Sequence, residues 1–332
     1  MHFLKLFPLF SQRKRVICAL VSIAILLCCA PSRAADLEPA TRAVLHGEAD
    51  SAISLLRPII ASEPDNGEAH LLLCRVFYAE ERPTAAVPEC DAALRTLSNN
   101  SEAQDWAGRV YGLQADKAGP ITGLRMAFKV RQAFEAAVRL DAQNGVAVND
   151  LSEYYIDAPA VVGGGYDKAA QLADRSAARL PQNAHRIRAL SAEHQKDFGT
   201  AEREFRAAAA VADRPDAWAD LGAFYERREQ YDRATEALQH AIAVDRAHDS
   251  SLVDAATSLT EIHREPAVAE HAFRDYLVSH AQSDAAPAFR VHLELGKLLR
   301  SQGRKAEAKI EVQKALALAS GYAPARHELA GL

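Results

Sequence analysis

The chain has 332 residues, of which 49% are apolar and 25% are charged, and its formal net charge is −5. This length and apolar content would suffice for one or two ordinary globular domains. Met1 to Ala34 holds five of the 39 cations and no acid, so the rest of the chain carries 34 basic and 44 acidic residues, a net charge of −10. That balance excludes nucleic acid as an expected partner, because no basic stripe is available to neutralise a phosphate backbone.

Residues 1–34 have the pattern of a secretory signal peptide. The basic cluster Arg13-Lys14-Arg15 precedes a largely apolar run over 16–30, and small residues follow up to Ala34. As a helix the run would extend only about 22 Å, which is shorter than the roughly 30 Å hydrocarbon core of a bilayer. We therefore expect cleavage after Ala34 and no stable membrane span in the mature chain. The alternatives are an uncleaved anchor and a lipid attached to Cys28 or Cys29.

Cys74 and Cys90 are the two cysteines that would remain after processing. Both fall in one predicted helical hairpin that reverses near residues 81–83, which places Ala86 opposite Cys74 and Cys90 one helical turn further on. That offset should separate the two Cα atoms by more than the ~7 Å that a disulfide can bridge. We expect two small buried thiols. A disulfide is the alternative, since exported proteins commonly form them.

The segment 215–248 defines a repeated unit. Its first half has the spacing W-x2-L-G-x2-Y, and its second half continues at helical intervals after a short polar break, which is typical of a helical hairpin. The residues that carry this pattern are Trp218, Leu221, Gly222, Tyr225, Tyr231 and Ala234. The segment resembles the tetratricopeptide repeat family, in which 34-residue helix pairs stack into a right-handed superhelix whose concave face binds other proteins. Leu238 and Arg246 depart from the Phe and Pro that are usual in the family.

The same helical pattern recurs along the chain, and no strand-like alternation persists. We expect an all-α solenoid over residues 35–332, right-handed as the resemblance implies, with apolar surface buried between neighbouring repeats. The expected repeats span about 37–66, 67–100, 101–144, 145–183, 184–214, 215–248, 249–284 and 289–322, and a short capping helix follows over 324–332.

Two repeats contain insertions. In the third, the segment 115–125 either lengthens the first helix or forms a projecting loop. In the fourth, the passage from Tyr154 to Ala169 includes Gly163-Gly164-Gly165, which is incompatible with a regular helix. We interpret it as a stiff elbow between helices, and a loop that contacts a ligand is the alternative. The passage resembles an insert of some bacterial envelope proteins with tetratricopeptide repeats, which together with the signal implies a periplasmic or envelope-associated protein.

The small residues Gly222 and Ala234 are expected to face each other where the two helices of the reference repeat cross. Tyr225 and Tyr231 should fill the space around them, and Trp218 should reach toward the preceding repeat. On the first helix of each pair, the residues between the core positions should face the groove, although any one of them could simply be solvated. The candidates are Arg75, Tyr78, Asp105, Arg109, Asn149, Glu153, Arg188, Glu226, Lys297 and Arg300.

Nothing in the sequence predicts an enzyme, a cofactor or a metal site. His263 and His271 lack the spacing of a metal site, and neither H-E-x-x-H nor G-x-S-x-G occurs. The sequence therefore favours a non-catalytic scaffold that binds a protein or peptide in its concave groove. Members of the family that bind the C-terminal carboxylate of a peptide use paired Lys and Asn residues on consecutive first helices. Only Asn149 fits that pattern here, so the sequence does not favour this class of ligand. The alternative function is a structural component that self-associates or docks on an outer-membrane complex.

Overall fold

The computed structural model describes residues 36–332, so the predicted signal peptide lies outside the described residues. Within this range the chain forms 17 α-helices and one short 3₁₀ helix and contains no strand. Residues Leu37–Leu332 make up one compact unit. None of the helices described is long and apolar enough to cross a bilayer. The expectation of an all-α solenoid is confirmed.

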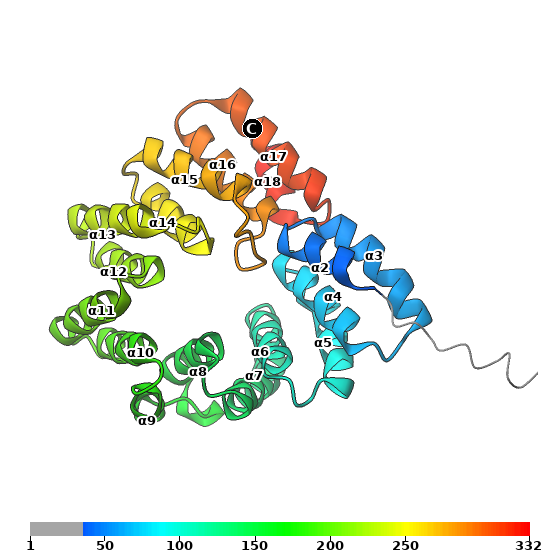
Figure 1. Ribbon diagram of the computed structural model, residues 1–332, viewed down its shortest axis with the longest axis horizontal. Coiled ribbons are helices and arrows are strands. Elements are labelled where there is room, and N and C mark those ends of the chain that lie inside the picture. Colours follow the sequence, from blue (N-terminus) through cyan, green and yellow to red (C-terminus); the bar gives the residue numbers. More distant parts are fainter. Residues whose placement is uncertain (1–35) are drawn as a thin grey trace, which may run out of the picture. The chain divides into compact units, whose positions relative to one another are not determined.

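Sixteen of these helices form eight consecutive hairpins, and the last helix packs on the eighth hairpin (Figure 1). The hairpins are α2 Glu38–Leu45 with α3 Ala49–Ser62, α4 Gly67–Ala79 with α5 Pro83–Thr96, α6 Ser101–Asp116 with α7 Pro120–Leu140, α8 Gly145–Asp157 with α9 Tyr166–Ser176, α10 Pro181–His194 with α11 Phe198–Ala212, α12 Pro215–Arg227 with α13 Tyr231–Val244, α14 Ser250–Glu261 with α15 Pro266–Val278, and α16 Ala288–Ser301 with α17 Lys305–Leu318. The 3₁₀ helix η1 spans Ala160–Val162, and the final helix α18 spans Ala323–Ala330.

Local sequence signals place the ends of these helices. Asn66, Asn100 and Asn144 precede α4, α6 and α8, and each side-chain oxygen accepts a hydrogen bond from the backbone N–H three residues later. Such caps satisfy N–H groups that the first turn of a helix leaves unpaired. In most of the hairpins, although not between α6 and α7, the turn uses a residue with positive φ, as at Glu81, which reverses the chain after the first helix.

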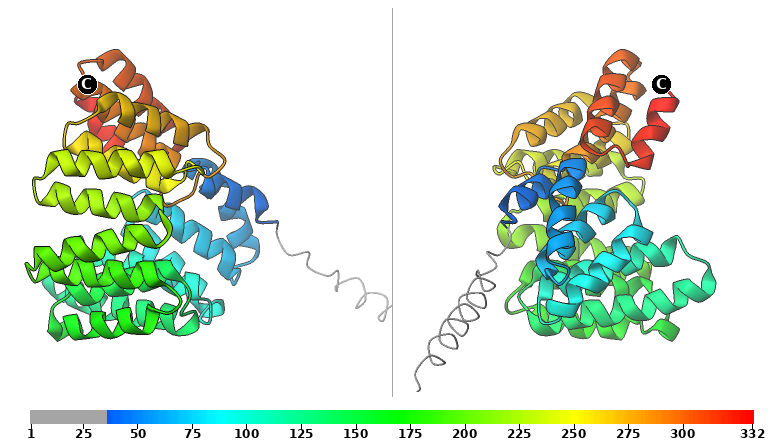
Figure 2. Two further views of the ribbon diagram at one scale, coloured as in Figure 1. Left: turned by 60° about the vertical axis from the view of Figure 1, so that its left-hand side comes forward. Right: turned by 90° about the vertical axis from the view of Figure 1, so that its right-hand side faces the viewer.

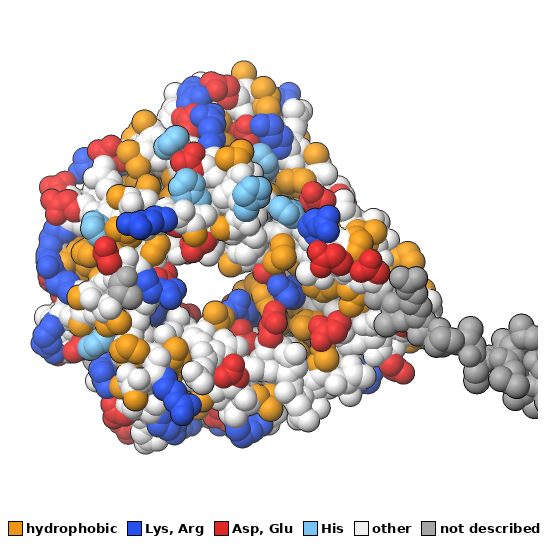
Figure 3. All heavy atoms as spheres, in the orientation of Figure 1, with side chains coloured by type: hydrophobic (Ala, Val, Ile, Leu, Met, Phe, Trp, Pro, Cys, Tyr) orange, Lys and Arg blue, Asp and Glu red, His pale blue; other side chains and the backbone are white. Residues whose placement is uncertain are grey.

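The two ends of the unit Leu37–Leu332 meet, so the stacked hairpins close into a ring (Figures 1 and 2). One apolar cluster contains Val44 and Leu56 from the first hairpin together with Phe289 and Val312 from the last. Viewed with all atoms, the ring keeps an opening at its centre (Figure 3). The sequence predicted a solenoid with a C-terminal capping helix; in the structure α18 packs on α17, and the first and last hairpins also contact each other.

Polar contacts fix the closure. Arg75 on α4 donates to Asp284 over 2.7 Å, and Arg290 on α16 donates to the carbonyl oxygen of Ala79 over 3.0 Å. Gly47 has a φ of +67°, and a Cβ at this position would overlap the backbone of Ala288. Only glycine combines this conformation with so close an approach.

Small residues set the spacing of the helices within three of the hairpins. A Cβ on Gly222 would lie 2.5 Å from Cδ2 of Leu238, and one on Gly296 would lie 2.7 Å from Cγ2 of Val312. The expected contact between Gly222 and Ala234 is therefore wrong in detail, since the glycine faces Leu238, one helical turn beyond Ala234. The side chain of Leu238 packs into the space that a Cβ on residue 222 would otherwise occupy.

The other residues of the reference repeat divide between core and surface. Leu221 and Tyr225 are buried, and Ala234 is fully buried. Tyr231 is 40% exposed, so it begins α13 at the surface and does not fill the crossing as expected. Trp218 packs against an alanine pair of the preceding repeat, and its ring lies 4.2 Å from that of His240 in its own hairpin.

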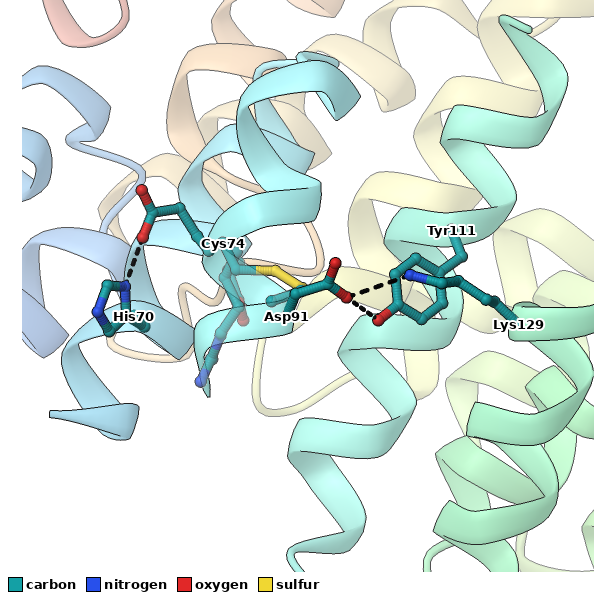
Figure 4. Close-up of a disulfide and its surroundings, with 9 residues drawn as sticks. His70, Cys74, Asp91, Tyr111 and Lys129 are labelled. Atoms are coloured by element: carbon teal, nitrogen blue, oxygen red, sulfur yellow. Dashed lines mark hydrogen bonds and ion pairs between the residues drawn. A yellow bond between two sulfur atoms is a disulfide. The ribbon is translucent and has the colours of Figure 1, made fainter. Parts of the chain in front are cut away.

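Cys74 and Cys90 form a disulfide between α4 and α5 (Figure 4), which corrects the expectation of two free thiols. Their Cα atoms are 5.3 Å apart, and both side chains are buried. Gly67 at the start of α4 faces Thr96 and Leu97 at the end of α5. In this register the residue opposite Cys74 lies further along α5 than Ala86, which brings Cys90 within reach.

The two insertions have different structures. Both helices of the third hairpin are lengthened, and α7 reaches 21 residues, so the segment 115–125 extends the hairpin rather than forming a long loop. The glycines of the fourth repeat form a tight elbow between α8 and α9: Gly163 and Gly165 have φ of +97° and +151°, and a Cβ on Gly164 would overlap the carbonyl of Ala158. This geometry agrees with the interpretation as an elbow.

Removal of the disulfide should destabilise the protein. It closes a loop of 16 residues, and releasing it enlarges the conformational freedom of the unfolded chain. We expect Cys74→Ala/Cys90→Ala to lower the free energy of unfolding by about 2–4 kcal/mol, measured by urea denaturation without reductant. Reductant should destabilise the wild type and leave the double variant unchanged; equal effects on both proteins would contradict the disulfide.

Substitution of Gly222 tests the helix crossing. Gly222→Ala should lower the melting temperature, because its Cβ overlaps Leu238 and forces repacking that costs about 1–3 kcal/mol. Gly112→Ala on α6 is the matched control, since a Cβ there meets nothing within 4 Å. The control should stabilise by up to about 1 kcal/mol through helix propensity. The same sign of change in both variants would refute the packing argument.

Candidate binding groove

Three neighbouring pockets merge into one groove along the first helices of the central hairpins. Tyr78, Arg109 and Asp150 line the first pocket, of about 570 Å³, at α4, α6 and α8. A second, of about 560 Å³, shares Glu153 and Asp157 with it and continues over α10 to α12. A third, of about 270 Å³, reaches α14. The second and third pockets share Arg186, so the groove is continuous from α4 to α14. Space-filling side chains of both charges surround the central opening (Figure 3).

Arg186 lies in the middle of this groove and links three repeats. Its Nε donates to Asp220 on α12 over 2.8 Å, and its Nη2 donates to Glu153 on α8 over 2.7 Å. The remaining nitrogen, Nη1, is buried without a hydrogen-bond partner among the described residues. A buried guanidinium N–H without an acceptor is costly. Arg186 itself lines the second and third pockets, so its guanidinium lies at the point where the two pockets meet.

A second charged cluster joins α6 to α8. Arg109 donates through Nε to Asp150 over 2.5 Å and lies 3.2 Å from Asp105, which is almost fully buried. Burial, reinforced by the neighbouring Asp150, raises the pKa of Asp105 to about 7. Burial also raises the pKa of Asp150, against the attraction of Arg109. One arginine thus serves two carboxylates, and this wall of the groove binds protons readily near neutral pH.

The far end of the groove, over α12 and α14, is acidic. Asp216, Asp220 and Asp254 line the same pocket. Desolvation by the surrounding groove walls, reinforced by the charges of Asp220, Asp249 and Asp216, raises the pKa of Asp254 to about 6. Its side chain is accessible and has no ion-pair or hydrogen-bond partner among the described residues. A cationic side chain brought to this pocket would relieve the repulsion among the carboxylates.

Amide side chains lie between the two charged regions. Asn183 on α10 donates through Nδ2 to the side-chain oxygen of Asn149 on α8 over 2.9 Å and to the carbonyl of Gly145 over 3.0 Å. Gln182 donates to Asp216 over 2.8 Å. Pairs such as Asn149–Asn183 and Gln182–Asp216 are 34 residues apart, so equivalent positions of successive repeats contact one another along the groove.

The structure distributes the predicted groove residues unevenly. Tyr78, Arg109, Asn149 and Glu153 line the pockets. Arg75 and Asp105 support the same wall: Arg75 pairs with Glu102 over 2.9 Å, in addition to Asp284. Burial raises the pKa of Glu226, and Ser258 on α14 donates a hydrogen bond to it. It is not among the residues that line the pockets.

Three predicted groove residues lie elsewhere. Arg188 pairs with Asp174 on α9 over 2.9 Å and so faces the second helix of the preceding hairpin. The prediction is wrong because α10 begins at Pro181 rather than near 184, which places Arg186 at the inward position. Lys297 pairs with Glu294 on its own helix, and Arg300 pairs with Glu328 on α18. Neither lines any of the three groove pockets.

Sequence reasoning missed Asp150, Arg186, Asp220 and Asp254. A signal for three of them was present: Arg186, Asp220 and Asp254 follow one another at the repeat length, since Arg186 and Asp220 bond across 34 residues and Asp254 comes 34 residues later. Aligning the fifth repeat on Pro181, as the counterpart of Pro215, would have identified the row.

The fold and the groove define an α-solenoid of helical hairpins, the class of protein that presents a surface for binding other macromolecules. The tetratricopeptide repeat family matches over residues 43–109, 215–248 and 263–323. These matches support the assignment of the chain to the tetratricopeptide repeat proteins, whose repeats generally mediate protein–protein interaction. No curated protein matches the chain.

Several solved structures are similar in fold at low identity. The Cut9-Hcn1 hetero-tetramer of APC/C matches with 14% identity and a TM-score of 0.39, covering 96% of this chain and 59% of that one. The human IFIT1 dimer with m7Gppp-AAAA matches with 14% identity and a TM-score of 0.44, covering 85% and 68%. A tetratricopeptide repeat protein from Parabacteroides merdae matches with 16% identity and a TM-score of 0.38, covering 80% and 97%.

The raised pKa of Asp105 predicts a pH dependence of stability. The pKa of this carboxyl is 3.8 in the unfolded chain and about 7 in the folded protein. Between these pH values the folded protein therefore binds one proton that the unfolded chain has lost. The contribution of Asp105 to stability therefore falls as pH rises from about 4 to about 7. Asp105→Asn removes this loss and keeps an acceptor for Arg109. The melting temperature of the variant should rise relative to the wild type between pH 5 and pH 8; parallel curves would contradict the assignment.

Proposed function

We propose that the protein is a non-catalytic scaffold that binds a segment of another protein along the groove from α4 to α14. The observation that carries this proposal is the continuity of the three pockets through Glu153, Asp157 and Arg186. A groove along six consecutive first helices suits an extended chain better than a small molecule. Its amide side chains can pair with a peptide backbone.

The charge of the groove favours a partner segment with cationic side chains toward α14. Arg214 pairs with Asp216 over 3.0 Å and Arg186 pairs with Asp220 over 2.8 Å, so Asp254 is the carboxylate of that pocket without a cationic partner among the described residues. A lysine or arginine of the partner would supply the missing charge at Asp254. Electrostatic complementarity of this kind fixes the direction of a bound segment and raises its association rate.

The site of action that we propose is the periplasm or cell envelope of a bacterium. The basic cluster, apolar run and small residues of segment 1–34 support export, and the disulfide between Cys74 and Cys90 is of the kind that persists in oxidising compartments. Fractionation of cells, with sequencing of the N-terminus of the mature chain, tests this. A full-length chain in the cytoplasm would refute it.

A photo-crosslinking amino acid inside the groove tests the binding proposal. Ala223 on α12 lines the acidic pocket, whereas Lys309 on α17 is exposed and outside the groove. In intact cells, crosslinking from position 223 should capture a defined protein partner that position 309 does not capture. Capture of the same proteins from both positions would refute a groove-specific partner.

Asp254→Asn should weaken binding of the captured partner about tenfold or more, because an ion pair in a partly desolvated groove contributes 1.5 kcal/mol or more. The fold should be unaffected, since Asp254 has no partner to lose. Titration of the purified partner segment measures the affinity, and Glu236→Gln on α13, outside the groove, is the charge-matched control. Unchanged affinity of Asp254→Asn would move the cationic end of the partner away from α14.

A further inference from the structure

The lengthened end of the third hairpin presents an apolar surface that the groove does not use. Ile121, Leu124 and Phe128 on α7 are 87%, 47% and 37% exposed. They follow one another at intervals of three and four residues, which places them on one face of the helix. The matching end of α6 does not cover them, and the hairpin projects past its neighbours (Figure 2). Exposed apolar residues grouped in this way mark an interaction surface.

The elbow of the fourth repeat adds a further apolar side chain to the same surface. Val161 in η1 is 74% exposed, and η1 packs on α7. The hydroxyl of Tyr154 holds the two elements together, because it lies 2.9 Å from the carbonyl oxygen of Ala127 and 2.8 Å from that of Val162. Lys168 donates to the carbonyl of Gly163 over 2.6 Å. The elbow is therefore fixed, and Val161 is held next to the stripe of α7.

The charges that α7 itself places beside this surface are basic. Residues 120–134 contain Arg125, Lys129 and Arg131 and no acid, in a chain whose net charge after residue 34 is −10. Lys129 pairs with Asp91 over 3.5 Å, and Arg131 lies 3.9 Å from Glu135 on its own helix. Arg125 is exposed and has no ion-pair or hydrogen-bond partner among the described residues. Arg131 lies on the other side of the stripe, with its guanidinium 5.7 Å from the ring of Phe128. The apolar stripe is thus flanked by cations on both sides.

We propose that this surface, formed by Ile121, Leu124, Phe128 and Val161, docks on a lipid bilayer that contains anionic headgroups. A helix with an apolar face bordered by Arg and Lys lies in the plane of the interface, with the apolar side chains below the headgroups and the cations among the phosphates. A protein segment bound in the groove would not require an apolar face of α7 bordered by Arg and Lys. The docked hairpin would hold the groove at the membrane surface without crossing the bilayer.

Tryptophan fluorescence quenching by brominated lipid tests this in the full chain. Ile121→Trp places a reporter in the proposed surface, and Val278→Trp places one at an exposed position of α15, in the seventh hairpin. With vesicles of phosphatidylglycerol and brominated phosphatidylcholine, the reporter at 121 should be quenched several-fold more than the one at 278. Both proteins carry the apolar run 16–30, so its insertion cannot produce a difference between them. Equal quenching at both positions overturns the proposal.

Two further variants separate the apolar and charged contributions. In the Ile121→Trp protein, Leu124→Ser/Phe128→Ser should abolish most of the quenching, whereas Val211→Ser/Ile310→Ser, at comparably exposed positions on other helices, should not. Arg125→Glu should reduce quenching, and neutral vesicles of brominated phosphatidylcholine alone should give several-fold less than anionic ones. Quenching that ignores headgroup charge overturns the lipid assignment.

Sedimentation velocity distinguishes a second copy of the chain as the occupant. We expect the same sedimentation coefficient for the wild type and for Leu124→Ser/Phe128→Ser in the absence of vesicles. A wild-type dimer that the double variant loses would assign the surface to self-association and overturn lipid docking.

Discussion

Close contact between paired helices is the constraint on which this structure depends. Gly108, Gly222 and Gly296 stand at equivalent positions of three first helices, and each allows a side chain of its partner helix to enter where a Cβ would be: Phe134, Leu238 and Val312, respectively. The short distance between helices lets each hairpin pack as a thin layer against the next. Because apolar surface is buried only between neighbouring layers, the first helices are free to present polar residues to the inner side. The groove exists because the apolar side chains lie between the layers and the polar side chains of the first helices line the inner side.

The inner side is held together by charge as well as by packing. Arg75, Arg109 and Arg186 each bridge two carboxylates, and Arg186 in the fifth repeat joins Glu153 of the fourth to Asp220 of the sixth. Ion pairs between repeats set the position of the groove walls, whereas unpaired groups such as Asp254 remain for a ligand. The same surface is therefore both structural and available for recognition.

Two inserts make this solenoid different from a regular stack. The extension of α6 and α7 and the elbow at Gly163-Gly164-Gly165 lie beside each other, although the first belongs to the third hairpin and the second to the fourth. The elbow glycines are needed for backbone conformation and close approach, so their role in the chain is structural. These glycines hold η1 against α7, and Val161 in η1 is exposed next to that helix. The groove pocket is lined on α6 by Arg109, Gly112 and Asp116, whereas the lipid-docking surface that we propose is formed by α7 and η1.

The sequence by itself determined the helices and their pairing, because both depend on a local periodicity that recurs along the chain and on the capping and small residues that several repeats contain. It placed Tyr78, Arg109, Asn149 and Glu153 in the correct helices, and these residues line the groove. It failed for Arg188, where a shift of three residues in the repeat boundary changes the face of the helix, and for Cys74 and Cys90, where a small change in helix register decides whether two Cα atoms are within bridging distance. Only the tertiary structure decided that the stack closes on itself, because small rotations between layers accumulate over eight hairpins and no single repeat encodes their sum. It also decided which charged residues meet across repeats, since a contact between Arg75 and Asp284 joins positions that are remote in the sequence.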